Sequence, residues 1–389
     1  MRRNRIEGNH NHTTQQQFYN FTLEMVNNLP ALYVEDHDES EKEVNRTRYI
    51  LLYTSFYEDA SWGLPSVTVG TDYFKAKRCP VTNCVMTTDH GLVKPITEYD
   101  ALVYHGARRW KVKPPRERAR RQIYIAAIWE SPAHTEHPLG PETNSFFNWT
   151  MTYRLDSDIL FYYGIIVDLE SGEVVSPAYK PIWRYGFDAY RNATLVKLVS
   201  RKRVMAAQFV SHCGAVSKRD QLVQSLQDAG LMVDVYGLCG NYTCYHKSKS
   251  CGQMLDKVYW FYLSFENSLY VDYVTEKLYN ALEHNVVPIV YGGANYSRFA
   301  PPGSYIDVQD YGSAKQLVDY LRYLIENPQE YVKYFWWKQH YAIDKSSSVW
   351  CQVCEKLHSV STRTAVQYYR NIHSWWHDSA STAKQKLKF

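Results

Sequence analysis

Long apolar segments are missing from this chain. It contains no run of 18 apolar residues, and Met1–Gln17 is polar, without the apolar stretch of a secretion signal. Net charge is also scarce, at +4 over 389 residues. Basic residues gather only around 108–121, which favours a solvated surface over a nucleic-acid interface. No anchor is therefore visible in the sequence, and no nucleic-acid partner is expected.

The sequence also lacks a set of Cys and His residues at the spacing of a zinc site. Cys351 and Cys354 form a CxxC pair, but no second CxxC or HxxxH stands at finger or ribbon spacing. A redox role for this pair would need a thioredoxin-like strand before it, and none is present. The chain has eight cysteines, and Asn-x-Ser/Thr sequons occur at Asn11, Asn20, Asn45, Asn148, Asn192, Asn241 and Asn295. Both features indicate an oxidising, lumenal compartment and disulfide bonds.

The length and composition are those of a globular protein with more than one core. Hydrophobic residues make up 45% and charged residues 22% of the 389 positions, which is typical of folded chains. A chain of this length is expected to form two domains. Tyrosine (34) and tryptophan (11) are abundant, which suits contact with carbohydrate, although core packing accounts for most of them.

Changes in amino-acid composition and hydrophobic pattern along the chain predict four segments. Residues 1–45 are polar and predict a disordered stem. Residues 46–175 hold apolar strands of a first α/β domain, and 176–365 form a second domain after a Pro- and aromatic-rich connector. Residues 366–389 predict a polar, basic tail that frays.

The second domain has a strand–helix–strand pattern. Val204–Val210 predicts a strand, Ser217 caps a helix that ends at Gly230, and Leu231–Val235 predicts the next strand. A further helix begins at Ser313 with a capping box. Such alternation predicts the α/β fold class, with a parallel sheet covered on both faces.

The most informative stretch is 261–293. Phe261–Phe265 predicts a buried strand that leads into Glu266 and Asn267, and a helix is expected to begin near Asp272 as its N-cap, with Lys277 in its first turns. An acid, an amide and a lysine at a helix N-terminus behind a strand can hold a phosphate-bearing ligand.

The string FENS followed by DYVTEKLYNAL in this stretch resembles the donor-binding signature of the alpha-1,3-fucosyltransferases. The resemblance covers about residues 48–360 and implies a GT-B-type glycosyltransferase, with two Rossmann-like domains facing a central cleft. It implies GDP-fucose as the donor, with 46–175 as the acceptor-binding domain and 176–365 as the GDP-fucose-binding domain. The residues that it implies for donor binding are Ser211, Arg219, Asn267, Tyr273, Glu276 and Lys277.

The resemblance also implies a role for each group. Arg219 and Lys277 would bind the diphosphate, because fixed cations stabilise the negative charge of a departing nucleotide. Asn267 and Tyr273 would line the phosphate and sugar pocket, and Glu276 would hold ribose hydroxyls. The loop after Ser211 departs from the family pattern in carrying His212 and Cys213.

The strand Ile123–Trp129 ends in Glu130-Ser131-Pro132. Ligands of open α/β sheets lie beyond the carboxyl ends of strands, so a carboxylate there can accept a proton from a substrate. The family's ESP motif occupies this position, and the resemblance implies that Glu130 is the general base. The downstream string FNWTMTYRLDSD, residues 147–158, also resembles a family box, with Tyr153 and Arg154 as candidate cleft residues.

Asp156 and Asp158 form a D-x-D pattern, which in other glycosyltransferases binds a divalent cation. The resemblance places this box in the domain away from the nucleotide and supplies cations from Arg and Lys. No metal is therefore expected.

The cysteines extend the resemblance. It implies that Cys351 and Cys354 bridge to Cys79 and Cys84 and hold the two cleft walls in register. The connectivity of Cys213, Cys239, Cys244 and Cys251 does not follow from the sequence.

The expected function is inverting transfer of L-fucose from GDP-fucose to the 3-hydroxyl of N-acetylglucosamine in glycoprotein glycans, at the N-glycan core or an antenna. A catalytically inactive glycan-binding paralogue and a transferase using another nucleotide sugar are the alternatives. The resemblance implies a type II Golgi membrane protein, whose anchor is not visible in this chain.

Overall fold

The computed structural model describes residues 33–34, 46–64, 72–107, 112–135, 139–244, 249–346, 348–359 and 367–378. Their contacts divide them into two compact units. Unit 1 holds the described residues up to 130 together with 134–152 and 350–378, and unit 2 holds 131–133 and 153–349. Within the described ranges, no helix combines the length and the apolarity needed to cross a bilayer.

Unit 1 is built on a parallel sheet. Its strands are β2 (Arg48–Leu52), β3 (Cys84–Thr87), β4 (Ala101–His105), β6 (Ile123–Ile128) and β7 (Trp149–Thr152). They lie in the order β3-β2-β4-β6-β7, and each neighbouring pair is parallel. All residues of β4 and β6 are buried, as expected for strands covered on both faces.

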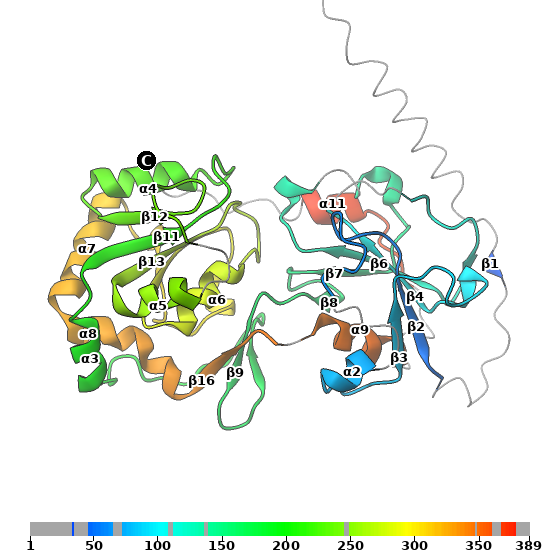
Figure 1. Cartoon of the computed structure of the whole chain (residues 1–389), viewed down its shortest axis with the longest axis horizontal. Coiled ribbons are helices and arrows are strands. Elements are labelled where there is room, and N and C mark those ends of the chain that lie inside the picture. The colour runs from blue at the N-terminus through cyan, green and yellow to red at the C-terminus, as the bar shows by residue number, and fades with distance from the viewer. Residues whose placement is uncertain are drawn as a thin grey trace, which may run out of the picture. The chain divides into compact units, whose positions relative to one another are not determined.

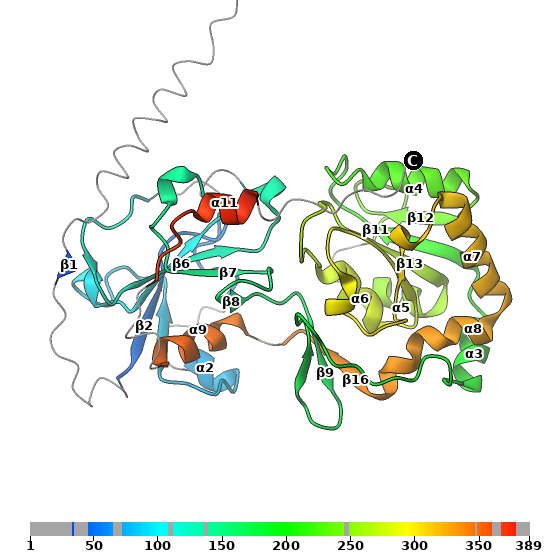
Figure 2. The same ribbon diagram turned by 180° about the vertical axis from the view of Figure 1, so that it is seen from behind.

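Three helices of unit 1 are α2 (Asp72–Ala76), α9 (Val349–His358) and α11 (Ile372–His377). Figures 1 and 2 show α9 and α11, near the end of the chain, beside strands from its beginning. The chain thus returns to unit 1 after completing unit 2. The units therefore differ from the predicted segments, because long-range contacts assign 153–175 to unit 2 and 350–359 to unit 1.

Both predicted disordered ends contain structure. The strand β1 (Tyr33–Val34) pairs in parallel with β5 (Arg118–Ala119), so this part of the stem is ordered. The α11 helix contradicts the fraying predicted for 366–389, because Ile372 and Trp376, one turn apart, are fully buried and fix the helix by packing. The rest of 1–45 and 379–389 lie outside the described residues.

Unit 2 has a sheet of five parallel strands in the order β12-β11-β13-β14-β15. These are β11 (Val204–Phe209), β12 (Val233–Tyr236), β13 (Tyr259–Phe265), β14 (Val287–Tyr291) and β15 (Ile306–Asp307). A small antiparallel sheet, β10-β9-β16, is formed by β9 (Ile165–Asp168), β10 (Val174–Ser176) and β16 (Tyr341–Asp344).

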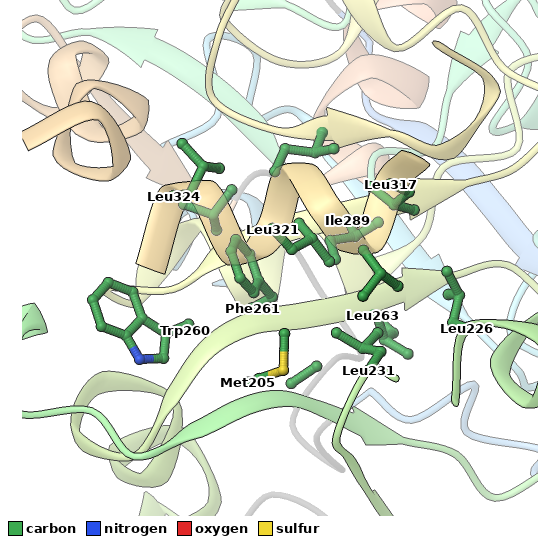
Figure 3. Packing of buried hydrophobic residues seen from close by; sticks show 14 of the residues in the cluster. Met205, Leu226, Leu231, Trp260, Phe261, Leu263, Ile289, Leu317, Leu321 and Leu324 are labelled. Atoms are coloured by element: carbon green, nitrogen blue, oxygen red, sulfur yellow. The ribbon is translucent and has the colours of Figure 1, made fainter. Parts of the chain in front are cut away.

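Helices cover both faces of the parallel sheet in unit 2. They are α3 (Ala193–Val199), α4 (Arg219–Asp228), α5 (Lys249–Lys257), α6 (Glu276–Glu283), α7 (Ala314–Glu326) and α8 (Pro328–Val332). Leu317, Leu321 and Leu324 of α7 pack on Phe261 and Leu263 of β13 (Figure 3). The side chain of Tyr262 lies on the opposite face of the sheet, where it packs with residues of α5 and α6. This follows from the alternation of side chains along a β-strand.

The fold class predicted from the sequence, α/β with Rossmann-like units, is confirmed for each unit. The predicted Ser313 cap of α7 is also confirmed, since its side chain accepts from the backbone N–H of Gln316. Gly230 follows α4 with φ +94°, a conformation in which glycine is favoured.

Candidate active site

The strand order of unit 2 indicates where a ligand binds. Counted along the chain, the order β12-β11-β13-β14-β15 is 2-1-3-4-5, so the connections turn in opposite directions from the carboxyl ends of β11 and β13. Open α/β sheets bind ligands at this topological switch point. The loops that follow the two strands, 210–218 and 266–275, hold or adjoin every donor-binding residue predicted from the sequence.

Glu266, directly after β13, is the centre of the polar network in this region. It is 1% exposed, and its carboxylate accepts hydrogen bonds from the backbone N–H of Thr275 at 2.8 Å and from the Thr275 hydroxyl. The ammonium of Lys277 lies 3.1 Å from the same carboxylate, 2.8 Å from Thr275 Oγ1 and 3.2 Å from Glu276 Oε1. Lys277 is therefore held at the N-terminus of α6 by three oxygen atoms.

These contacts keep Lys277 charged. Burial by itself lowers the pKa of its ammonium, but the carboxylates of Glu266 and Glu276 outweigh burial and raise the pKa above its ordinary value. Repulsion from Arg219 also acts on Lys277, so the two predicted cations lie close enough to interact. Two cations beside a helix N-terminus favour an anion.

Arg219, the first residue of α4, is 2% exposed. Its guanidinium donates to the carbonyl of Phe265 at 3.0 Å and to the carbonyl of His212 at 2.8 Å. The end of β13 and the loop after β11 thus fix its direction. Because the acceptors are neutral carbonyls, the guanidinium keeps its positive charge at the switch point.

The other predicted donor residues lie in the same region with different exposure. Ser211 is exposed after β11, and Glu276 is exposed on the first turn of α6. Asn267 is partly buried, and its side-chain oxygen is buried without a hydrogen-bond partner in the described part of the chain. Tyr273 is 1% exposed and packs on Tyr153, with ring centroids 4.9 Å apart.

Two predicted helix caps are wrong. The α6 helix begins at Glu276 with Thr275 as its N-cap residue. Asp272 instead has φ +60° and accepts from the backbone N–H of Leu155 at 3.2 Å. Lys218, and not Ser217, is the N-cap residue of α4. The Ser217 hydroxyl donates to the carbonyl of Glu266 at 2.7 Å and accepts from the backbone N–H of Arg219, the first residue of the helix, at 3.4 Å.

The DSD box lies in unit 2, and this corrects its expected place away from the nucleotide domain. Leu155 and Tyr153 contact Asp272 and Tyr273, as described above. Asp156 Oδ2 pairs with the guanidinium of Arg154 at 2.6 Å. The expectation that no metal binds here stays a prediction.

Among the described residues, one group has the side-chain spacing of a metal site, Cys84, Cys354 and His358. Its two cysteines are bonded to each other, so their thiolates are not available as ligands.

Glu130 lies in unit 1, two residues beyond the end of β6, and is partly exposed. Its neighbour Ser131 is fully buried and belongs to unit 2, where its hydroxyl lies 2.9 Å from that of Ser268. The ESP segment is thus hydrogen-bonded to the FENS segment. The sequence did not predict this contact, nor the part that Thr275 has in orienting Lys277.

All eight cysteines form disulfides. The pairs implied by the resemblance, Cys79–Cys351 and Cys84–Cys354, are confirmed. They lie within unit 1, where they attach α9, and not between two domains as expected. The remaining pairs are Cys213–Cys239 and Cys244–Cys251. The first of these joins the loops that follow β11 and β12, next to the predicted donor residues.

Asn148 lies in a glycosylation sequon, but its side chain is engaged in the interior of the folded chain. Asn148 is fully buried, its side-chain oxygen accepts from Tyr124 N at 2.7 Å and from Arg118, and its amide donates to Gln367 O at 3.0 Å. A glycan on this nitrogen is incompatible with that packing.

Comparison with known families agrees with this architecture. Residues 45–164 match the family "Fucosyltransferase, N-terminal", and residues 199–375 match "Glycosyltransferase family 10 (fucosyltransferase) C-term". Two parallel α/β units with these sequences define a glycosyltransferase.

Similar curated proteins include alpha-(1,3)-fucosyltransferase C of Drosophila melanogaster, 41% identical over 351 residues, which cover 89% of this chain and 82% of the relative. Glycoprotein 3-alpha-L-fucosyltransferase A of the same species is 33% identical, with 90% of this chain and 64% of the relative covered. The human 4-galactosyl-N-acetylglucosaminide 3-alpha-L-fucosyltransferase FUT5 is 35% identical, with coverage of 76% and 72%. The chain belongs to the alpha-1,3-fucosyltransferases of glycosyltransferase family 10.

Among solved structures, a crystal structure of an alpha1,3-fucosyltransferase with GDP-fucose is similar at 13% sequence identity and a TM-score of 0.49. The match covers 89% of this chain and 97% of that one.

Proposed function

We propose that the chain transfers L-fucose from GDP-fucose, with inversion, to the 3-hydroxyl of N-acetylglucosamine in glycoprotein glycans. The observation that carries the proposal is the pair of cations at the switch point of unit 2, the buried Arg219 and the partly buried Lys277. Arg219 is directed by neutral carbonyls and Lys277 by the Thr275 hydroxyl and the carboxylates of Glu266 and Glu276. Both side chains therefore stay cationic at the place where ligands bind in this fold.

In the proposed reaction, the acceptor oxygen forms a bond to the anomeric carbon of fucose while the bond from that carbon to the diphosphate oxygen breaks. The acceptor proton passes to the carboxylate of Glu130, the general base. The electron pair of the broken bond leaves with GDP, whose growing negative charge Arg219 and Lys277 stabilise. Attack opposite the leaving group inverts the anomeric centre, from the β-linked donor to an α-linked product.

The remaining donor residues have supporting roles in the proposal. The unpartnered side-chain oxygen of Asn267 can accept from a donor hydroxyl, which would remove the cost of leaving it unsatisfied. Glu276, exposed beside Lys277, would accept from the ribose hydroxyls. Tyr273 and the exposed Ser211 would complete the pocket. Neither cation needs a metal ion to be in place, so none is proposed.

Four disulfides and exposed sequons at Asn241 and Asn295 favour a lumenal location. We extend the proposal to the Golgi lumen with attachment to its membrane.

Incubation of the purified chain with GDP-fucose, other nucleotide sugars, and panels of chitobiose-core and N-acetyllactosamine glycans tests the function. We expect α1,3-fucosylated product from GDP-fucose alone, with its anomeric configuration read by NMR, and no loss of activity in EDTA. Absence of transfer from GDP-fucose to every N-acetylglucosamine-containing glycan would contradict the proposal. Binding of those glycans without transfer would identify an inactive glycan-binding protein instead.

A further inference from the structure

Unit 1 has a switch point of its own. Its strand order β3-β2-β4-β6-β7 is again 2-1-3-4-5 in chain order, so the switch lies between the carboxyl ends of β2 and β4. The same rule that locates a ligand in unit 2 applies here. The segments that follow these strands are 53–64 after β2 and Gly106 after β4, and Glu130 follows β6 beside them.

An aromatic cluster occupies this position. Phe56 is at its centre, with ring centroids 4.5 Å from Trp129, 4.6 Å from His105, 4.8 Å from Tyr57 and 5.4 Å from Trp62. Trp129 is the residue before Glu130. The aromatic cluster, as these five residues are called below, is therefore joined covalently to the proposed base.

Two members of the aromatic cluster are buried and three are partly exposed. Trp62 and His105 are 5% and 2% exposed, whereas Phe56, Tyr57 and Trp129 are partly exposed. Aromatic side chains that only filled a core would be buried throughout. Partly exposed aromatic rings held against buried ones can offer a surface to a sugar ring, whose C–H face packs on aromatic faces.

The loop that carries these rings is held in a strained conformation. Tyr57 and Trp62 have φ of +54° and +57°, in the left-handed region that bulky residues rarely adopt. Asp59 braces the loop by accepting from Ser61 N at 2.8 Å and Gly63 N at 2.7 Å.

The same loop is pinned to the strand ends. Trp62 Nε1 donates to Thr54 O at 2.6 Å, and Tyr57 N donates to His105 Nδ1 at 3.3 Å. Strain of this kind clusters at functional sites, where the surrounding structure fixes it. The loop therefore presents its rings in one orientation.

Trp350, near the N-terminus of α9, supports Trp62 with ring centroids 5.9 Å apart. The next residue, Cys351, is bonded to Cys79, so a disulfide secures this support within unit 1.

We propose that the aromatic cluster is the acceptor platform, on which a hexose or N-acetylhexosamine ring of the glycan lies with its hydroxyl toward Glu130. Phe56, Tyr57 and Trp129 supply the contact faces. The inference rests on the proposed function, because it names where the acceptor of that reaction binds.

Kinetics with varied acceptor test the platform. Tyr57→Ala and Trp129→Ala are each expected to raise the acceptor KM by about 10-fold, the loss of one ring contact, with unchanged GDP affinity. Tyr73→Ala is the matched control, because Tyr73 is a partly buried aromatic of unit 1 on α2, and its KM should equal the parent value. Parent KM in both cluster variants would overturn the platform and leave the rings as packing.

Binding without turnover separates this inference from the proposed function. Intrinsic tryptophan fluorescence of the parent should change on titration with chitobiose or N-acetyllactosamine, and the change should shrink in Trp129→Phe, the conservative variant if Trp129→Ala does not fold. A saturable fluorescence change in a chain that transfers no fucose would contradict the proposed reaction and support the acceptor platform. If the chain transfers fucose fully and the fluorescence titrations of the parent and Trp129→Phe are identical, the acceptor platform is contradicted and the proposed reaction is not.

Discussion

The two units share a strand order, and the residues at the carboxyl ends of their strands differ in kind. Unit 2 has charged side chains there. Arg219 is fixed by carbonyl oxygens, and Lys277 is fixed by carboxylate oxygens and a hydroxyl. Unit 1 places aromatic rings there, three partly exposed and packed with the buried Trp62 and His105, and the carboxylate of Glu130 follows in the chain. The topology that marks the switch point is the same in both units, and the difference between them lies in the loops.

This difference corresponds to the two halves of the proposed substrate pair. A nucleotide diphosphate is recognised by charge, and fixed cations in a partly buried site bind it strongly. A neutral glycan offers hydroxyls and C–H faces, for which aromatic rings are suited. Changes at the two strand ends should therefore separate into effects on donor affinity and effects on acceptor use.

The largest effect is expected from Glu130→Gln in unit 1. Loss of the general base should lower kcat by about 10²-fold or more, with GDP affinity near the parent value. Steady-state kinetics and calorimetry measure the two quantities. Glu98→Gln, which removes an exposed pair with Arg121, serves as the control. Turnover at the parent rate in Glu130→Gln would place the base elsewhere.

Next in size is Lys277→Ala in unit 2. Removal of a charge-assisted contact should weaken GDP and GDP-fucose together, by about 1.5–3 kcal/mol, as measured by calorimetry. Lys315→Ala removes an exposed lysine of α7 that pairs with Asp319 and should leave both affinities unchanged. If GDP binds Lys277→Ala as tightly as the parent, the donor site lies away from this helix.

A smaller effect, visible as a pH dependence, is expected from Glu266→Gln. In the parent, the carboxylates hold the pKa of Lys277 above its ordinary value, so the ammonium stays charged through pH 10. Without Glu266, burial lowers that pKa with less opposition, and GDP affinity should fall as pH rises from about 8 to 10, near the ordinary lysine pKa.

The control for that profile is Asp168→Asn, which removes another buried carboxylate of unit 2, paired with Arg184 at 2.9 Å. It should lower stability and leave the GDP profile flat. A flat profile in Glu266→Gln as well would mean that Glu266 only packs the loop and does not govern the charge of Lys277.

The last prediction concerns stability and not activity. The ammonium of Lys202 donates to Leu255 O and Tyr259 O in the interior of unit 2. Burial lowers the pKa of Lys202 to about 7, against roughly 10.4 in the unfolded chain. Between these values the unfolded chain binds the extra proton, so this group makes the free energy of unfolding rise with pH from about 7 to 10. Urea melts at several pH values give the free energy of unfolding of the parent and of Lys202→Met. This free energy should rise less steeply with pH in the variant, and an equal rise in both would contradict the shifted pKa of Lys202.

Sequence patterns predicted the features of unit 2 that depend on neighbouring residues. The strands, the Ser313 cap, the Gly230 terminus and the placing of Asn267 and Lys277 near a helix N-terminus all follow from local periodicity or capping. The start of α6 did not, because Asp272 is engaged by Leu155, a residue 117 positions away in the chain. Capping preferences describe an isolated helix, and a distant hydrogen bond overrides them.

Features of unit 1 were harder to predict for the same reason. The aromatic loop 53–64 has no periodicity, and its conformation depends on Asp59 and on contacts with His105. The return of residues 350–378 to unit 1 depends on packing and disulfides with residues about 270 positions earlier. The pairing of Cys213 with Cys239 likewise needs the positions of two strand ends, which no spacing rule supplies.

The return of the chain to its first unit has a consequence for biosynthesis. A ribosome delivers β2 to β7 long before Cys351 and Cys354 emerge, so Cys79 and Cys84 wait with reactive thiols while all of unit 2 is made. During that interval they are open to wrong partners, and an isomerase that edits mispaired thiols would be needed for efficient maturation. A nascent chain stopped before α9 would lack the native partners of both thiols.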